Sequence, residues 1–303
     1  MSGNDFNGVI NVFKEPGYTS HDVVAILRKV LKTKKIGHAG TLDPNVSGVL
    51  PICIGKATKI SQYLMEYGKT YIAEITFGIE TDTEDIWGNI IKTSDIEVNI
   101  ESFKKSITKF NGKTINQVPP MYSAVKVNGK KLYELARKGE IIERKPRKAN
   151  IYKLKILKIL NNKVIIKVTC SKGTYIRTLI KDICEKSGTI GTMSSLIRVN
   201  SGGLDINDSL TIQQIKDLID KKIYDFIKPI DKSLQKINKY ILPEKYFKKV
   251  INGVKIKIND DISNETVLVY CKDEFIGIGE FVLLDDIKFL KITNMFWNSN
   301  ENN

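Results

Sequence analysis

The sequence predicts an α+β fold with one large domain followed by a small β-rich one. Strand and helix patterns are mixed along the chain, without the regular alternation of a doubly wound parallel sheet. The chain has 303 residues, and a single hydrophobic core stops growing near about 250–300 residues. The balance of charges also changes near Lys239. We therefore predict two domains, residues 1–238 and 239–303.

The first short elements follow directly from apolar patterning. Residues 8–13 form an apolar run of strand character that ends at Pro16 and Gly17. Ser20 is a candidate N-cap for a helix whose apolar residues recur at helical spacing. Residues 35–55, with four glycines and two prolines, break this pattern and predict an irregular loop, and a helix is expected over 56–64.

Alternation and helical spacing predict the rest of the large domain. Residues 69–78 alternate as a strand with one buried face, and residues 101–110 are expected to form a helix. Two strands joined at Asn161-Asn162 predict a hairpin, and the apolar residues from Ile176 onward predict a helix that ends at Gly188. In the small domain, three short strands are expected at residues 267–270, 275–278 and 287–292.

The charge distribution favours a polyanionic partner. The net charge is +14, and residues 1–238 hold 39 basic and 24 acidic residues, whereas residues 239–303 hold 9 and 10. A positive charge of this size indicates a polyanionic partner, and nucleic acid is the first candidate. The alternative is that a base-composition bias of the genome enriches lysine without gathering it on one face. The segment 126–148 alone carries 9 basic and 3 acidic residues, which suits an arm along a phosphate backbone or a merely solvated basic helix.

Several classes of protein are disfavoured. No apolar stretch reaches the length of a membrane span, and the first residues lack the pattern of a secretory signal, so we expect a cytoplasmic protein. A phosphate-binding loop motif is absent, which argues against a nucleotide cofactor. Only two histidines and four scattered cysteines occur, so we expect no metal site and no other cofactor: His21, His38, Cys53, Cys170, Cys184 and Cys271.

Asp43 is the most conspicuous candidate for chemistry. It precedes Pro44, which favours an extended backbone, and glycines surround it. A carboxylate on such a loop can act as nucleophile or general base, or it can simply form an Asp-Pro turn. Arg177, in the first turn of its helix, could hold that carboxylate ionised or flank an apolar stripe at the surface. Tyr71 could be a core residue, and His38 could stack on a base or finish a turn.

Ordered motifs resemble the bacterial TruB-type tRNA pseudouridine synthases. The resemblance centres on G-H-A-G-T-L-D-P at residues 37–44 and continues through S-G-V-L-P at 47–51. Further matches are K-T-Y at 69–71, Q-V-P-P-M-Y-S-A at 117–124 and C-S-K-G-T-Y-I-R at 170–177. Together with an early segment and K-K-L-Y-E-L-A-R at 130–137, these matches cover nearly all of residues 8–200.

The resemblance implies a pseudouridine synthase fold, a mixed β-sheet flanked by helices, and a small C-terminal domain similar to a PUA RNA-binding domain. Residues 117–148 would be an inserted thumb that grips RNA. The implied reaction is the isomerisation of uridine 55 in the T-loop of tRNA, which needs no cofactor and requires the base to leave its stack. The implied partner is the T-arm of tRNA, and we expect a monomer.

The resemblance also implies roles for individual residues. Asp43 matches the catalytic aspartate, which attacks the sugar or removes the C2′ proton. Arg177 matches its arginine partner, and Tyr71 the tyrosine that packs on the base and helps to remove the C5 proton. The remaining matches are substrate-binding His38, Tyr175 and Leu196 and the thumb residues expected on the RNA backbone, Lys130, Lys131, Arg144 and Lys145.

Two other function classes remain open. The same basic surface could belong to a non-catalytic RNA-binding or chaperone protein. A glycosidase would instead pair Asp43 with a second acid such as Asp82 or Asp85. Loss of tritium from C5-labelled uridine separates the enzyme from the binder, and free uracil would identify the glycosidase.

Overall fold

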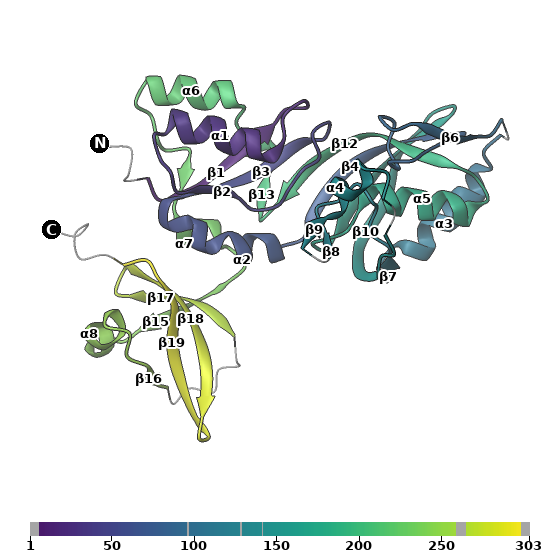
Figure 1. The fold of residues 1–303 in the computed structure, drawn as a ribbon. Coiled ribbons are helices and arrows are strands. Elements are labelled where there is room, and N and C mark those ends of the chain that lie inside the picture. The colour runs from purple at the N-terminus through teal and green to yellow at the C-terminus, as the bar shows by residue number, and fades with distance from the viewer. Residues whose placement is uncertain (1–5, 96, 128, 141, 259–264, 298–303) are drawn as a thin grey trace.

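The computed structural model describes residues 6–95, 97–127, 129–140, 142–258 and 265–297. Within these residues the chain forms a ten-stranded sheet and a separate five-stranded sheet (Figure 1). Helices accompany both sheets, which confirms the α+β class. None of the helices in the described ranges is long and apolar enough to cross a membrane.

The large sheet is mixed, as expected. Its order is β14-β1-β3-β12-β4-β11-β10-β7, and two short strands, β13 and β2, pair with β12 and β3. The β12–β3 pair is parallel, and the other pairs in this sheet are antiparallel. The strands are β1 Gly8–Lys14, β2 Ile36–His38, β3 Ser47–Ile54, β4 Lys69–Phe77, β7 Lys113–Gln117, β10 Arg147–Ile159, β11 Lys163–Cys170, β12 Gly191–Ser201, β13 Leu204–Asp205 and β14 Ile227–Lys228.

The principal apolar core lies between this sheet and the helices that pack against it. Buried side chains of β1, β3, β4, β11 and β12 join in one cluster with residues of four helices, such as Leu27, Phe103, Leu179 and Ile215. These helices are α1 Ser20–Val30, α3 Ile100–Phe110, α5 Ile176–Ser187 and α6 Ile212–Asp220. In Figure 1, α1 and α6 lie near one end of the sheet and α3 and α5 near the other.

Two predicted helices need correction. Helix α1 is capped by Thr19 and not by Ser20, because the Thr19 side chain accepts from the backbone N–H of Asp22 and the Asp22 carboxylate accepts from the backbone N–H of Thr19. The Ser20 hydroxyl instead contacts a neighbouring loop. The helix expected over 56–64 is divided into a 3₁₀ turn, η1 Gly55–Ile60, and α2 Ser61–Glu66. The Thr58 hydroxyl donates to the Gly55 carbonyl within the 3₁₀ turn.

The irregular loop expected over residues 35–55 is wrong for much of its length, because β2 Ile36–His38 and β3 Ser47–Ile54 form there. The other predicted elements are present, although the strand expected at 275–278 extends to Leu284. Helix α5 ends at Gly188, which has a left-handed backbone with a φ of 79°. The predicted hairpin is β10 and β11, and β10 begins earlier than the apolar pattern suggested. A small two-stranded sheet, β5 Ile79–Thr81 with β6 Ile90–Thr93, follows β4. Two further elements lie in the sequence between β13 and the C-terminal sheet, η2 Ile206–Asp208 and α7 Ile230–Ser233.

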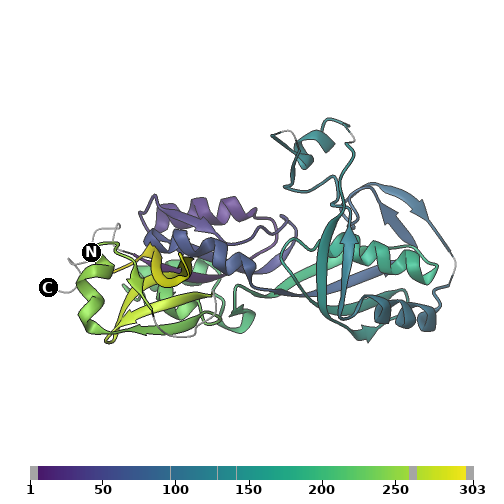
Figure 2. The same ribbon diagram turned by 90° about the horizontal axis from the view of Figure 1, so that it is seen from below.

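The thumb, residues 117–148, is an insertion between neighbouring strands. Its ends meet in the β7–β10 ladder, where Gln117 lies opposite Arg147. Figure 2 shows this segment, in teal, projecting away from the sheet. It contains the two-stranded sheet of β8 Lys126–Val127 and β9 Lys130–Lys131, followed by α4 Leu132–Ala136.

The C-terminal sheet packs against the large domain. Its order is β15-β17-β18-β19-β16. Leu268, Tyr270 and Phe296 share a buried cluster with Leu64 of α2, and the Tyr270 hydroxyl donates to the carboxylate of Asp231, 2.8 Å away. The elements here are β15 Asn238–Leu242, η3 Glu244–Tyr246, α8 Phe247–Ile251, β16 Ile256–Lys257, β17 Thr266–Cys271, β18 Glu274–Leu284 and β19 Ile287–Met295.

Candidate active site

The loop between β2 and β3 carries Asp43 and is fixed on both sides of it. The backbone N–H of Leu42 donates to the Ser20 hydroxyl over 2.9 Å. The ammonium of Lys14 donates to the Pro44 carbonyl over 2.9 Å. Because both neighbours are anchored to other elements, the backbone of Asp43 has a defined position, while its side chain is about half exposed.

Lys14 is a buried cation beneath this loop. Its ammonium also donates to the carbonyls of Glu15 and Tyr18, at 3.0 and 2.7 Å. Burial lowers its pKa to about 8, and the charge of Asp43 acts in the opposite direction. Carbonyl acceptors thus compensate for the lost water around the ammonium and tie three points of the loop region together.

Arg198, on β12, is fully buried and hydrogen-bonds to the same loop. Its guanidinium donates to three backbone carbonyls, those of Thr41, Gly40 and Val49, at 3.2, 3.0 and 2.8 Å. The backbones of Gly48 and Arg198 lie so close together that a Cβ on Gly48 would be 2.2 Å from the Arg198 carbonyl oxygen. Only glycine fits at that position, where φ is +114°.

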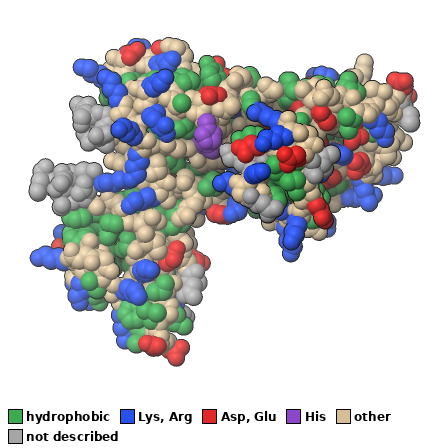
Figure 3. Space-filling view, viewed as in Figure 1, with side chains coloured by type: hydrophobic (Ala, Val, Ile, Leu, Met, Phe, Trp, Pro, Cys, Tyr) green, Lys and Arg blue, Asp and Glu red, His purple; other side chains and the backbone are tan. Residues whose placement is uncertain are grey.

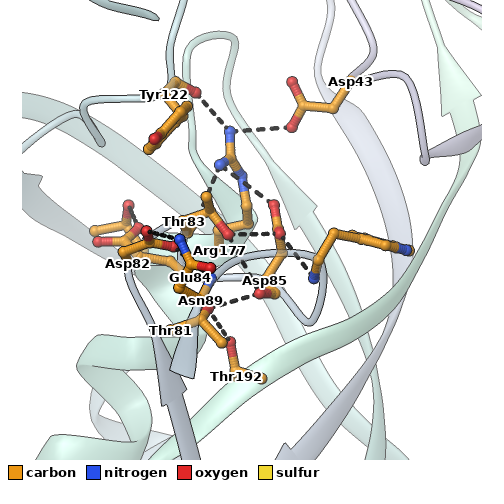
Figure 4. A network of polar contacts seen from close by, with 12 residues as sticks. Asp43, Thr81, Asp82, Thr83, Glu84, Asp85, Asn89, Tyr122, Arg177 and Thr192 are labelled. Carbon is orange, nitrogen blue, oxygen red and sulfur yellow. Dashed lines mark hydrogen bonds and ion pairs between the residues drawn. The ribbon is translucent and has the colours of Figure 1, made fainter. Parts of the chain in front are cut away.

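Arg177, in the first turn of α5, joins Asp43 to a second loop (Figure 4). Its Nη2 atom lies 3.0 Å from Asp43 Oδ2, and its Nη1 atom lies 3.4 Å from Asp85 Oδ2. The same guanidinium donates to the carbonyls of Thr83 and Tyr122, both over 2.9 Å. The guanidinium is therefore held by four oxygen atoms, and it presents one edge to the more exposed Asp43.

Asp85 lies on the loop between β5 and β6 and is more enclosed than Asp43. Burial raises the pKa of Asp85, whereas a hydrogen bond from Thr83 and the charge of Arg177 oppose that rise. The neighbouring Asp82 does not face Arg177. Its carboxylate accepts from the backbone and side chain of Asn89, at 2.9 and 3.0 Å.

Tyr71, on β4, lies opposite Arg198 in the strand ladder. The residue is buried, which raises the pKa of its phenol, and the charge of Arg198 acts against that rise. The phenol is therefore a neutral group close to the Asp43 loop at ordinary pH.

The two histidines are in contact. The rings of His21 and His38 meet edge to face, with centroids 5.3 Å apart. Burial lowers the pKa of His38 to about 4, and its Nδ1 atom has no hydrogen-bond partner among the described residues. In Figure 3 histidine reaches the surface between the region of α1 and the thumb.

A pocket of about 430 Å³ opens at Asp43. This volume falls in the range of small-molecule sites and suits one nucleotide. Its walls come from the start of α1, the Asp43 loop, the β5–β6 loop, α5 and the thumb. The lining residues are Thr19, Ser20, His21, Thr41, Leu42, Asp43, Pro44, Asn45, Val46, Thr83, Asp85, Trp87, Tyr122, Ala124, Tyr133, Arg137 and Arg177.

The structure thus brings Asp43 and Arg177 together at the pocket, whereas the other expected catalytic and substrate-binding residues are not among the described residues that line it. His21, rather than His38, is in the pocket wall. Tyr175 is the N-cap residue of α5 and is outside the pocket lining, and its backbone N–H and carbonyl are bonded to the Gln117 side chain at 3.1 and 3.2 Å. Tyr71 and Leu196 are buried residues outside the pocket lining.

The cations expected on RNA have different surroundings in the thumb. Lys130 and Lys145 are exposed, whereas Arg144 is half-buried and donates to the Pro119 carbonyl over 3.0 Å. Lys131 belongs to β9, and its side chain lies outside the described part of the structure. On the face drawn in Figure 3, Lys and Arg side chains lie over the α1 region, the thumb and the C-terminal sheet.

Sequence reasoning missed the supporting residues of the site. Lys14 and Arg198 carry no local signal of burial, and Asp85 was considered only as a glycosidase acid. Within the described ranges, no three histidine, cysteine, aspartate or glutamate side chains are grouped so as to hold a metal ion.

Comparison with known proteins gives a consistent result along the chain. The model of the TruB family pseudouridylate synthase N-terminal domain matches residues 28–176, and that of the tRNA pseudouridylate synthase B C-terminal domain matches residues 177–235. A protein of Alkaliphilus oremlandii named tRNA pseudouridine synthase B is 48% identical over 280 residues, which cover 90% of this chain and 92% of that protein. The protein of the same name from Staphylococcus haemolyticus is 47% identical over 282 residues, or 89% and 92% of the two chains.

Solved structures show the same fold. A chain of a Cbf5-Nop10-Gar1 complex superimposes with a TM-score of 0.75 at 27% identity, covering 99% of this chain and 87% of that one. A chain of an H/ACA RNP bound to a substrate RNA containing 2′-deoxyuridine gives a TM-score of 0.73 at 25% identity, with 96% and 85% covered. These matches confirm the expected pseudouridine synthase fold.

Proposed function

Because the chain belongs to the TruB family of pseudouridylate synthases, we propose that it isomerises a uridine of tRNA to pseudouridine, and that this uridine is position 55 of the T-loop. The observation that carries the proposal is the Asp43 carboxylate, half exposed at the pocket and 3.0 Å from the Arg177 guanidinium. The relatives named tRNA pseudouridine synthase B supply the substrate class.

The reaction exchanges one glycosidic bond for another. The bond between C1′ and N1 breaks, the uracil turns, and a bond forms between C1′ and C5. The proton on C5 is released, and N1 ends the reaction protonated, so no atoms are gained or lost overall. Asp43 begins this sequence either by attacking C1′ or by removing the C2′ proton, and a fixed, ionised carboxylate suits both routes.

Arg177 has the geometry to orient Asp43, since its Nη2 atom lies 3.0 Å from Asp43 Oδ2. The contacts of Arg177 with Asp85, Thr83 and Tyr122 fix the guanidinium before substrate enters, so little reorganisation is needed in the reaction. We assign Asp85 the role of holding Arg177, since its carboxylate is the more enclosed of the two.

The substrate reaches this pocket only as an extruded nucleotide. A stacked base would keep its sugar away from Asp43, and flipping it out costs a few kcal/mol. We assign His38 to contact with the extruded nucleotide, Tyr71 to packing on its base, and Tyr175 and Leu196 to the uracil pocket. Tyr71 also takes part in the loss of the C5 proton. For Tyr71 and Leu196, which are buried, these roles require that the bound base displace neighbouring side chains.

The thumb and the C-terminal sheet are the proposed RNA-binding parts. Four thumb residues lie in the pocket lining, so RNA held by the thumb would pass directly over Asp43: Tyr122, Ala124, Tyr133 and Arg137. Exposed cations such as Lys130 and Lys145 suit contact with backbone phosphates of the T-arm. We assign residues 239–303 to a PUA-like RNA-binding domain.

Tritium release tests this function. A T-arm hairpin RNA labelled with tritium at C5 of its uridines should lose label with the wild-type protein, and the product should contain pseudouridine. Asp43→Asn should release less than about one thousandth as much while it binds the RNA normally, because the amide is neither a nucleophile nor a base. Asp220→Asn, which changes an exposed aspartate at the end of α6, should match the wild type. An Asp43→Asn protein with substantial activity, or a wild type that yields free uracil, would contradict the proposal.

A further inference from the structure

Trp87 is an exposed aromatic side chain at the entrance of the pocket. It lines the pocket together with Asp43, yet 48% of its surface remains accessible. Tryptophan side chains are highly buried on average in folded proteins. Nothing in the proposed chemistry of Asp43 and Arg177 uses this indole.

The loop that presents Trp87 is closely bonded. The Asp85 carbonyl accepts from the Thr81 hydroxyl over 2.6 Å, and the Asp85 carboxylate accepts from the Thr83 hydroxyl over 2.7 Å. The backbone N–H of Trp87 reaches the same carboxylate at 3.3 Å. A Cβ on Gly88 would lie 2.2 Å from the Thr83 hydroxyl oxygen, so the turn is tight immediately after the tryptophan.

This loop therefore links the indole to the reacting groups. Asp85 holds both the Trp87 backbone and the Arg177 guanidinium, which in turn holds Asp43. Figure 4 shows Arg177 between Asp85, which belongs to the β5–β6 loop, and Asp43. The backbone from which the indole projects is thus fixed relative to Asp43.

Other aromatic rings line the pocket from the thumb. Tyr122 and Tyr133 belong to that wall, and the Arg137 guanidinium lies over the Tyr133 ring, 5.6 Å from its centroid. Aromatic rings and guanidinium planes are the groups on which unstacked RNA bases are received. Extrusion of one nucleotide also exposes the faces of the bases on either side of it.

We propose that Trp87 is a stacking platform for an RNA base adjacent to the target uridine. The proposal rests on the proposed function, since it takes a single-stranded RNA loop as the substrate. It makes Trp87 a substrate-binding residue that replaces the stacking lost when the target nucleotide leaves the loop. Substitution should therefore weaken RNA binding and leave the chemical step unchanged.

The chain offers a direct optical test because it has only two tryptophans. Trp297 lies away from the pocket, where its indole N–H donates to Glu274 over 2.7 Å. In a Trp297→Phe protein, all indole emission comes from Trp87. A saturating T-arm hairpin should quench that emission, and a hairpin with abasic nucleotides on both sides of the target should quench much less. Unchanged emission at saturation with the intact hairpin would overturn the proposal.

Kinetics provide the second test. Trp87→Ala should raise KM for the T-arm RNA about tenfold with kcat within twofold of the wild type. Trp87→Phe should restore KM to within about threefold, since it keeps a stacking face. Ile91→Ala, which truncates an exposed apolar residue of β6 outside the pocket lining, should change neither constant.

The outcomes separate this proposal from the function on which it rests. If the wild type releases tritium and Trp87→Ala has an unchanged KM, the stacking platform is refuted and the enzyme stands. If RNA quenches Trp87 but the wild type releases no tritium, RNA stacking at this site is supported and the proposed reaction fails.

Discussion

Replacing Arg177 with lysine removes the geometry of the site while it keeps the charge. The guanidinium now contacts four oxygen atoms, those of Asp43, Asp85, Thr83 and Tyr122, from a buried position. An ammonium is a single point with three donors, so it cannot reach four acceptors that surround a planar fork. At least one enclosed acceptor is then left unpaired.

The expected magnitude follows from that count. An unpaired buried acceptor costs about 1–3 kcal/mol, so Arg177→Lys should lower the free energy of unfolding by about 2 kcal/mol. Asp43 also loses its 3.0 Å contact, and a misplacement of about 1 Å in a reacting group can cost about 100-fold in rate. We expect kcat to fall about 100-fold with the RNA dissociation constant within threefold of the wild type.

Urea unfolding and single-turnover tritium release measure the two effects separately. Arg28→Lys, the same exchange at an exposed position of α1, is the matched control and should change neither quantity. Retention of half the wild-type kcat by Arg177→Lys would refute the positioning role. An equal loss of kcat and RNA affinity would indicate that the arginine mainly contacts phosphate.

Further predictions concern the support of the loop, an acidic group and the thumb. Lys14→Met removes the donor of three carbonyls and should lower the free energy of unfolding by at least about 2 kcal/mol, measured by urea titration; an unchanged midpoint would contradict this. The pKa of Asp182 is raised from 3.8 to about 6, by burial first and then by the charges of Glu185 and Glu84. The native state binds this proton more tightly than the unfolded state, so protonation of Asp182 stabilises the fold. The stabilisation is complete below pH 3.8 and is lost as the pH rises through about 6. The melting temperature of Asp182→Asn should therefore gain on that of the wild type between pH 4 and 7, and a constant difference would refute the assignment. Neutralising four thumb cations together should flatten the salt dependence of tRNA binding, whereas an unchanged slope would remove the thumb from the interface: Lys130, Lys131, Arg144 and Lys145.

Local patterns in the sequence predicted those parts of the fold that local physics decides. Alternation identified β4, and helical spacing with a terminal glycine identified α5 up to Gly188. The choice between Thr19 and Ser20 as the cap of α1 could not be made locally. It depends on the Ser20 hydroxyl being occupied by Leu42, which comes from another part of the chain.

The candidate site also contains residues that local sequence identifies and contacts that only the folded chain shows. Asp43 was identifiable from its Asp-Pro loop among glycines, and Arg177 from the motif around it. The contacts of Arg177 with Asp85 and Tyr122 join segments that are distant in the sequence and meet only in the folded chain. Lys14 and Arg198 resemble surface cations in a basic chain, and only the folded structure shows the backbone carbonyls that accept hydrogen bonds from them.

The contact between Asp43 and the substrate is the most direct test of the mechanism. A crystal structure of Asp43→Asn bound to a T-arm hairpin RNA would show it. The account predicts that the target nucleotide is extruded into the pocket, with the side chain at position 43 within about 3.5 Å of C1′ or C2′ of its ribose and Arg177 still in contact with that side chain. An RNA bound on the opposite face, with every ribose far from this side chain, would contradict it.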